Sequence, residues 1–235
     1  MLKLYTGNRN YSSWSMRPWV VLTQAGIAFE DIVVRFDSFE PSSDFKRKIG
    51  AVNPAAKVPA LVDTDAGDLA IWDSLAICEY VAEGFPAKNL WPKDRSARAR
   101  ARSICAEMHS GFSALRSHCP MNIEAKLEDV GARLLKSEPS LQTDVTRIGA
   151  MIGELLEQHG GPLLFGDFSI ADAYFAPVAM RFHTYALPAP PPVAVYMQRL
   201  RELPGARAWI DLALAEHDFL PFDEPYRSAA DPQIK

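Results

Sequence analysis

Hydrophobic positions in residues 1–84 alternate between strand-like and helix-like spacing. β-branched and apolar runs predict strands over 2–6, 31–36, 58–62 and 69–72, and amphipathic stretches predict helices over 15–24, 42–49 and 74–83. Gly26 and Gly84 follow two of these helices, where a glycine commonly ends a helix. Pro18 lies in the first turns of its helix, where its missing N–H is tolerated. The predicted order is βαβαββα.

Strand signals almost vanish beyond a turn-rich linker at 85–92. Apolar recurrence predicts helices over 97–115, 140–159, 169–182, 193–201 and 204–216. Ser169 and Asp172 have the spacing of a capping box, with Asp in place of the usual Glu or Gln. We therefore expect an α/β domain over 1–84, an all-helical domain over 93–220, and a polar, frayed tail over 221–235.

Composition restricts the class of protein. Of 235 residues, 48% are hydrophobic and 23% are charged, so the chain can bury a core. A net charge of −4 argues against nucleic acid or an anionic membrane as the main partner, and no apolar run approaches the roughly 18 residues that span a bilayer. Cys78, Cys105 and Cys119 form no disulfide framework, and the N-terminus lacks a signal-peptide pattern. We expect a soluble cytoplasmic protein.

A metal site is not expected. Cys105 and His109 are four residues apart on one predicted helix face and could form one edge of such a site. No second pair at ligand spacing accompanies them. Cys78 lies among apolar neighbours, which favours a core position over a nucleophilic one.

Three segments could bind an anionic or peptide ligand. The segment 10–18 places Ser12, Ser13 and Ser15 between a strand and a helix N-terminus, where free amides favour an anion. Val58-Pro59 begins a strand, and a cis proline there would direct the Val58 backbone outward. A strand runs into a helix at 73–74, which offers amides, a hydroxyl and a carboxylate. Each segment taken alone is equally an ordinary helix cap or strand start.

Taken together, in this order and spacing, the three segments resemble the N-terminal domain of the glutathione S-transferase family. The run Gly166-Asp-Phe-Ser-Ile-Ala-Asp-Ala-Tyr174 is similar to the start of the long buried helix in that family's helical domain. The resemblance covers about residues 1–220. It implies a thioredoxin-like α/β domain followed by an all-α domain, with glutathione as cosubstrate and a homodimeric assembly.

The resemblance also implies roles for single residues. Asp73 and Ser74 would hold the γ-glutamyl end of glutathione, although the usual acid is the longer Glu. Val58 would pair through its backbone with the cysteinyl part, and Lys57 would meet the glycyl carboxylate.

The segment Ser12-Ser-Trp-Ser-Met-Arg17 is similar to the Ser-Ser-Cys-Ser-x-Arg motif of the zeta class. Ser12 matches the serine that activates the thiol and is our predicted catalytic residue; Ser13, Ser15 and Tyr5 are alternatives. Trp14 replaces the motif's cysteine, which argues against zeta-type isomerisation.

The second substrate would be a small, partly hydrophobic electrophile. By resemblance its pocket involves Tyr11, Met108, Phe112 and Arg181, although Met108 and Phe112 also have the spacing of core residues. The predicted function is a glutathione transferase acting in detoxification. The alternatives are a non-enzymatic binding or regulatory protein of the same fold, and a glutathione-dependent reductase, peroxidase or isomerase.

Overall fold

The N-terminal part of the chain folds around a four-stranded sheet. The computed structural model describes residues 1–230, and its strands are β1 (Leu2–Thr6), β2 (Phe29–Val33), β3 (Ala60–Asp63) and β4 (Leu69–Trp72). Their order in the sheet is β2-β1-β3-β4, with β1 and β2 parallel and the other pairs antiparallel. Helices α1 (Ser13–Gln24), α2 (Asp44–Gly50) and α3 (Ser74–Gly84) complete the expected βαβαββα order.

The two faces of this sheet pack against different helices. Leu4 and Leu61 are fully buried in the main hydrophobic cluster with residues of α1 and α3. Tyr5 and Ala60 belong to a second cluster with Phe45 of α2. Because neighbouring residues of a strand point to opposite faces, Tyr5 lies on the side of the sheet away from α1.

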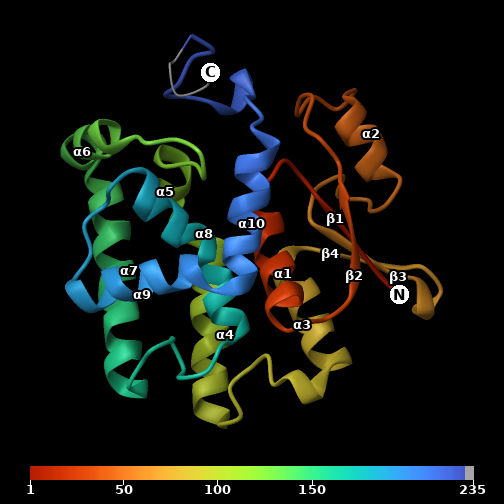
Figure 1. Ribbon diagram of the computed structural model, residues 1–235, viewed down its shortest axis with the longest axis horizontal. Helices are drawn as coiled ribbons and strands as arrows, with labels where there is room; N and C mark the ends of the chain where they lie inside the picture. The colour runs from red at the N-terminus through yellow and green to blue at the C-terminus, as the bar shows by residue number, and fades with distance from the viewer. Residues whose placement is uncertain (231–235) are drawn as a thin grey trace.

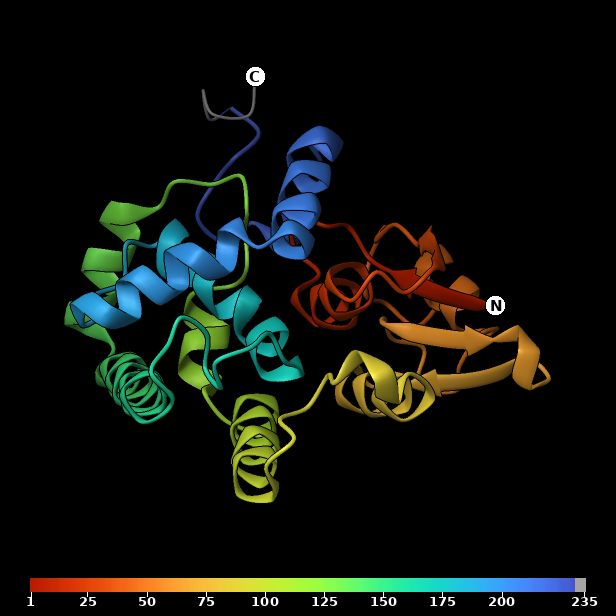
Figure 2. The same ribbon diagram turned by 60° about the horizontal axis from the view of Figure 1, so that its bottom comes forward.

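The rest of the chain is helical. Its helices are α4 (Arg95–Ser110), α5 (Ser113–His118), α6 (Glu128–Ser137), α7 (Pro139–His159), α8 (Ile170–Thr184), α9 (Pro191–Glu202) and α10 (Pro204–Glu216). Short 3-10 turns occur at Thr64–Ala66, Pro86–Lys88 and Pro221–Asp223. The sheet lies at one side of the molecule and the helical domain at the other, and α1 packs against both α8 and α10 between them (Figures 1 and 2).

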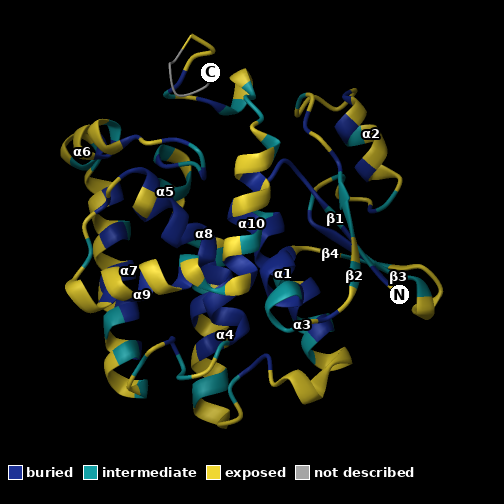
Figure 3. Cartoon of the chain, viewed as in Figure 1, coloured by how far each residue is buried: buried dark blue, intermediate teal, exposed yellow. Residues whose placement is uncertain are grey.

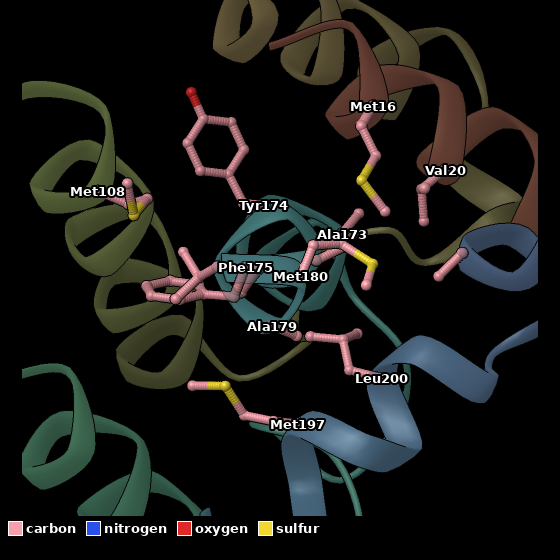
Figure 4. Packing of buried hydrophobic residues seen from close by; sticks show 14 of the residues in the cluster. Met16, Val20, Met108, Ala173, Tyr174, Phe175, Ala179, Met180, Met197 and Leu200 are labelled. Atoms are coloured by element: carbon pink, nitrogen blue, oxygen red, sulfur yellow. The ribbon is translucent and has the colours of Figure 1, made fainter. Parts of the chain in front are cut away.

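Helix α8 forms the centre of the helical domain. Every residue of this helix except His183 is buried, and the ribbon is correspondingly dark in Figure 3. In Figure 4, Phe175 lies toward α4, which carries Met108, and Ala179 lies toward Leu200 and Met197 of α9. The expected capping box is present at its N-terminus, where Asp172 accepts the Ser169 N–H at 2.9 Å. This cap lets the helix start inside the core without unpaired amides.

The helical domain differs from the sequence prediction in two places. The helix expected over 97–115 is divided into α4 and α5, because Phe112 adopts a left-handed conformation with φ 51°. A Cβ on Gly111 would lie 2.7 Å from the Glu107 carbonyl oxygen, so the break requires glycine at that position. Helix α6 was not predicted, although Leu127, Val130 and Leu134 follow helical spacing there. In the sheet, β2 also begins earlier than the expected 31–36.

The tail that was expected to be frayed is partly ordered. Glu224 and Arg227 are buried, and Glu224 accepts a hydrogen bond from the Tyr11 hydroxyl at 2.7 Å. The carboxylate also accepts from Asn122 Nδ2 at 2.9 Å. The tail is therefore held by the fold as far as Arg227, residues 228–230 are exposed, and 231–235 lies outside the described residues. Within 1–230, none of the helices has the length and apolarity needed to cross a bilayer.

Candidate functional site

A cavity of about 450 Å³ lies where the α/β domain meets the start of the helical domain. Its lining residues come from α1, the loop before β3, the β4–α3 junction, α4 and α5: Trp14, Ala55, Lys57, Val58, Pro59, Trp72, Asp73, Ser74, His109 and Arg116. All four residues predicted to hold glutathione, Lys57, Val58, Asp73 and Ser74, are among them. The volume is within the usual range for a small-molecule site.

The β4–α3 junction presents Asp73 and Ser74 to this cavity. Asp73 caps α3 by accepting the Leu75 N–H at 2.8 Å, and it has a positive φ of 73°. This backbone region is unfavourable for a residue with a Cβ. Ser74 is the first residue of α3 and is buried. The strained turn brings a carboxylate and a hydroxyl to one side of the cavity, at the positive end of a helix.

The loop before β3 presents the peptide backbone to the same cavity. The Val58–Pro59 bond is cis, as the sequence suggested. The buried Asn53 side chain holds this loop in place, because its Nδ2 donates a hydrogen bond to the Lys57 carbonyl at 3.1 Å. Lys57 is exposed at the rim, where its ammonium is accessible to a carboxylate.

A second cavity of about 330 Å³ adjoins the first. Trp14 and Arg116 line both cavities, and the rest of the second is formed by Tyr11, Ser13, Ser113, Ser117, Pro120, Met121, Arg181 and Asp223. Tyr11 and Arg181, which were predicted for the electrophile pocket, both line this second cavity. Met108 and Phe112 lie in the hydrophobic core and line neither of these two cavities.

The candidate serines at the start of α1 have different surroundings. The Ser12 hydroxyl donates to Ser15 Oγ at 2.7 Å, and neither cavity is lined by Ser12 or Ser15. Ser13 lines the second cavity, and its Oγ accepts a hydrogen bond from Arg181 Nη2 at 3.3 Å. The Ser13 hydroxyl proton therefore remains available to a ligand, whereas that of Ser12 is already used within the protein.

Positive charge is concentrated around this helix start. Arg17 and Arg181 are fully buried, and neither forms an ion pair within residues 1–230. Their donors reach backbone carbonyls instead, as in the 2.8 Å bond from Arg17 Nη1 to Ser13 O and the 2.9 Å bond from Arg181 Nε to Cys119 O. Burial lowers the pKa of Arg17 to about 10 and that of Arg181 to about 9. An anion nearby would compensate these charges.

Comparison with protein families accounts for this arrangement. Residues 11–83 match the glutathione S-transferase N-terminal domain, and residues 95–212 match the glutathione S-transferase C-terminal domain. The chain belongs to the glutathione S-transferase family.

Its relatives in this family include zeta-class proteins. The chain is 33% identical to glutathione S-transferase Z2 of Arabidopsis thaliana, over 87% of this chain and 88% of the relative. It is 32% identical to a probable maleylacetoacetate isomerase of Caenorhabditis elegans, over 80% and 83%. A crystal structure of a glutathione transferase homolog from Burkholderia (strain BGR1) with bound glutathione is 26% identical. It has a TM-score of 0.66 and covers 91% of this chain and 98% of that one.

The sequence analysis did not predict three of the residues that line the first cavity. Trp14 was considered only as a departure from a motif, His109 only as half of a metal pair, and Arg116 not at all. All three line the first cavity, while the described residues contain no cluster of three or more His, Cys, Asp or Glu side chains that could hold a metal. His109 and Arg116 lie in other helices than the motifs, so no short-range pattern identifies them.

Proposed function

We propose that this protein is a glutathione-dependent transferase. Glutathione lies in the first cavity, with its γ-glutamyl end at Asp73 and Ser74, its cysteinyl backbone at Val58 and its glycyl carboxylate near Lys57. The observation that carries the proposal is the junction of the two cavities, where Ser13, Arg181 and Arg116 surround the start of α1. A thiolate at this point faces an electrophile in the second cavity.

The energetics of thiolate formation support this assignment. A free thiol has a pKa near ~8.5, so lowering it by two units requires about 2.7 kcal/mol. A hydrogen bond to a charged group contributes about 1.5–3 kcal/mol, and a helix N-terminus adds about 0.3–1 kcal/mol. One serine hydroxyl at the start of α1, in the field of buried guanidinium groups, is therefore sufficient.

Ser13 is the proposed donor to the thiolate. The sequence resemblance favours Ser12, and that prediction stays open to test. The geometry favours Ser13, because it lines a cavity and its proton is not used by another protein group.

We expect Ser13→Ala to lower kcat about ten- to hundredfold while the Kd for glutathione changes less than about threefold. Ser12→Ala should have the smaller effect on kcat. The measurement is steady-state conjugation together with ultraviolet titration of the bound thiolate, whose pKa should rise in the Ser13 variant. If Ser12→Ala alone raises the thiol pKa, the assignment to Ser13 is wrong and the zeta-type assignment is right.

Isomerisation is a second candidate, because one relative is named a probable maleylacetoacetate isomerase. Arg181 and Arg116 in the second cavity would suit a substrate with carboxylate groups. Trp14 in place of the motif's cysteine is the observation against it.

The decisive experiment is retention on glutathione-agarose followed by turnover with halides, enones, epoxides, peroxides and a cis-enone dicarboxylate. Conjugation supports the transferase, isomerisation without net glutathione consumption supports the second candidate, and retention without turnover supports a binding or regulatory protein. Failure to bind glutathione contradicts all of these. A cytoplasmic homodimer acting in detoxification, with no metal in its reaction, completes the proposal.

A further inference from the structure

The side chains of His109 and Tyr174 connect the two residues proposed to bind the γ-glutamyl group, Asp73 and Ser74. His109 Nε2 lies 3.3 Å from Asp73 Oδ2, and His109 Nδ1 lies 2.8 Å from the Tyr174 hydroxyl. That hydroxyl lies 3.1 Å from Ser74 Oγ. The four residues come from the β4–α3 junction, α4 and α8, and three of them line the first cavity.

The surroundings hold His109 and Tyr174 in place. Tyr174 is fully buried, and Figure 4 shows its ring extending from α8 with the hydroxyl at the outer end. The Arg17 guanidinium lies 4.8 Å from this ring and 4.2 Å from the Trp14 ring, and Trp14 in turn lies 5.1 Å from the imidazole of His109. Nδ1 of His109 is therefore held toward the Tyr174 hydroxyl and Nε2 toward the Asp73 carboxylate.

The direction of the hydrogen bonds follows from the chemistry of each group. A carboxylate only accepts, so it favours the tautomer of a neutral His109 that carries its proton on Nε2, the nitrogen that faces Asp73 Oδ2 at 3.3 Å. Nδ1 then accepts from the Tyr174 hydroxyl, and the Tyr174 oxygen accepts from Ser74. In this state the Ser74 proton points to Tyr174, so Ser74 cannot donate to a ligand.

A bound γ-glutamyl group requires the opposite direction. Its α-carboxylate needs Ser74 as a donor, so Tyr174 must donate to Ser74 and Nδ1 of His109 must donate to Tyr174. Its α-ammonium pairs with the Asp73 carboxylate.

We propose that His109 is a positioning residue that changes tautomer when the γ-glutamyl group binds. Nε2 loses its proton to water and Nδ1 gains one from water, so the net proton count is unchanged. The two hydroxyls rotate: Nδ1–H donates to Tyr174, Tyr174 donates to Ser74, and Ser74 donates to the ligand carboxylate. This inference rests on the proposed function, because it concerns the glutathione cavity.

The tautomer can be read directly from the ¹⁵N spectrum of histidine-labelled protein at about pH 8, where an unperturbed imidazole is neutral. The His109 signals are assigned by their loss in His109→Phe. We expect an Nε2–H form in the free protein and an Nδ1–H form with saturating glutathione. Retention of Nε2–H in the complex overturns the inference, as does protonation of both nitrogens in either state.

Affinity measurements provide an independent test by calorimetry. His109→Phe should weaken glutathione binding about ten- to hundredfold but leave binding of N-acetylcysteinylglycine, which lacks the γ-glutamyl group, within about twofold. The matched control is His118→Phe: the His118 side chain has the same exposed fraction, 35%, and also pairs with a carboxylate, that of Glu138. Equal losses for both ligands would make His109 merely structural and overturn the inference.

A third variant tests the hydrogen-bonded route from His109 through Tyr174 to Ser74 separately from the His109–Asp73 ion pair. Tyr174→Phe keeps the ring and the contact with Arg17 but removes the link to Ser74, so glutathione should no longer shift the imidazole to the Nδ1–H form. A shift that persists in this variant overturns the proposed route. If the wild-type protein does not bind glutathione at all, the proposed function fails; if it binds without a tautomer change, only this inference fails.

Discussion

Trp14 occupies the position where the zeta-class motif has a cysteine, and its surroundings explain what the indole does there. Its ring lies under the Arg17 guanidinium and beside His109, and it lines both cavities. Trp14 thus gives both cavities an aromatic wall and leaves this position without a thiol. In the proposed function the reactive sulfur is that of glutathione.

The protein's own cysteines should therefore be unreactive. Cys78, Cys105 and Cys119 are all buried, and burial raises the pKa of all three thiols, that of Cys119 to about 12. We expect no labelling of the native protein by a thiol-reactive disulfide at pH 7.5, and three thiols per chain after unfolding in urea. Rapid labelling of one thiol in the native state would contradict this.

At the scale of elements, helix α8 shows how a buried helix start is made possible. Asp172 is fully buried and accepts hydrogen bonds from the Ser169 N–H and hydroxyl, the Leu164 N–H and the Tyr196 hydroxyl. These bonds favour its ionised form, but burial outweighs them and raises the pKa of Asp172 to about 6. The capping spacing is visible in the sequence, whereas the burial that shifts the pKa is not.

This raised pKa gives a pH dependence of defined sign. An unfolded aspartate has a pKa near ~3.9, so between about pH 4 and 6 the folded state binds the proton more tightly than the unfolded state does. The free energy of unfolding contributed by Asp172 should therefore fall as pH rises through this window, by at most on the order of 3 kcal/mol, and stay constant above it.

The measurement is urea unfolding at pH 4.5, 5.5 and 7 for the wild type and for Asp172→Asn, which keeps the side-chain shape but does not titrate. As pH rises, the free energy of unfolding of the wild type should fall relative to that of Asp172→Asn. Parallel pH profiles would mean that the carboxylate is already ionised at pH 4.5.

The break between α4 and α5 shows what element-level patterns miss. The apolar spacing continues from 97 to 115, so periodicity alone predicts one helix. The contact of Gly111 with the Glu107 carbonyl and the left-handed Phe112 end α4 there, and the turn brings Arg116 to both cavities. A single continuous helix would place Arg116 elsewhere.

At the scale of the whole molecule, the ordered tail joins parts of the chain that are far apart in sequence. Arg227 pairs with Glu224, and both side chains are shielded from water; Glu224 also binds Tyr11 of the N-terminal loop and Asn122 of the helical domain. The tail thus closes over the loop that leads into α1, and its Asp223 lines the second cavity. Stability of the site and of the tail should be coupled.

Breaking this buried pair should be costly. Arg227→Met leaves the Glu224 carboxylate buried without its cation, which we expect to lower the free energy of unfolding by about 3–5 kcal/mol. Glu224→Gln combined with Arg227→Met should recover part of the loss, because position 224 then carries no unpaired charge and Glu124, the second partner of Arg227, keeps its pair with His217. The measurement is urea unfolding.

The control is Arg207→Met, which removes an exposed pair with Asp211 within α10. Its side chains are 63% and 53% exposed, so the expected effect is below about 1 kcal/mol. Equal losses for the Arg227 and Arg207 variants would show that the buried Arg227–Glu224 pair stabilises the fold no more than a surface pair does.

The sequence by itself determined the two-domain division, the order of the elements in the α/β domain and the local structure of the cavity residues that adjoin strand ends. The cis Val58–Pro59 bond and the helix start at Asp73 and Ser74 could be predicted because a turn or a helix cap is set by neighbouring residues. Only the tertiary structure decided which serine at the start of α1 faces a cavity. It also brought His109 and Arg116 to the first cavity from α4 and α5, and it placed Tyr174 of α8 between His109 and Ser74. The position of each depends on the packing of helices distant in sequence, and helical spacing identifies the buried face of a helix but not its partner.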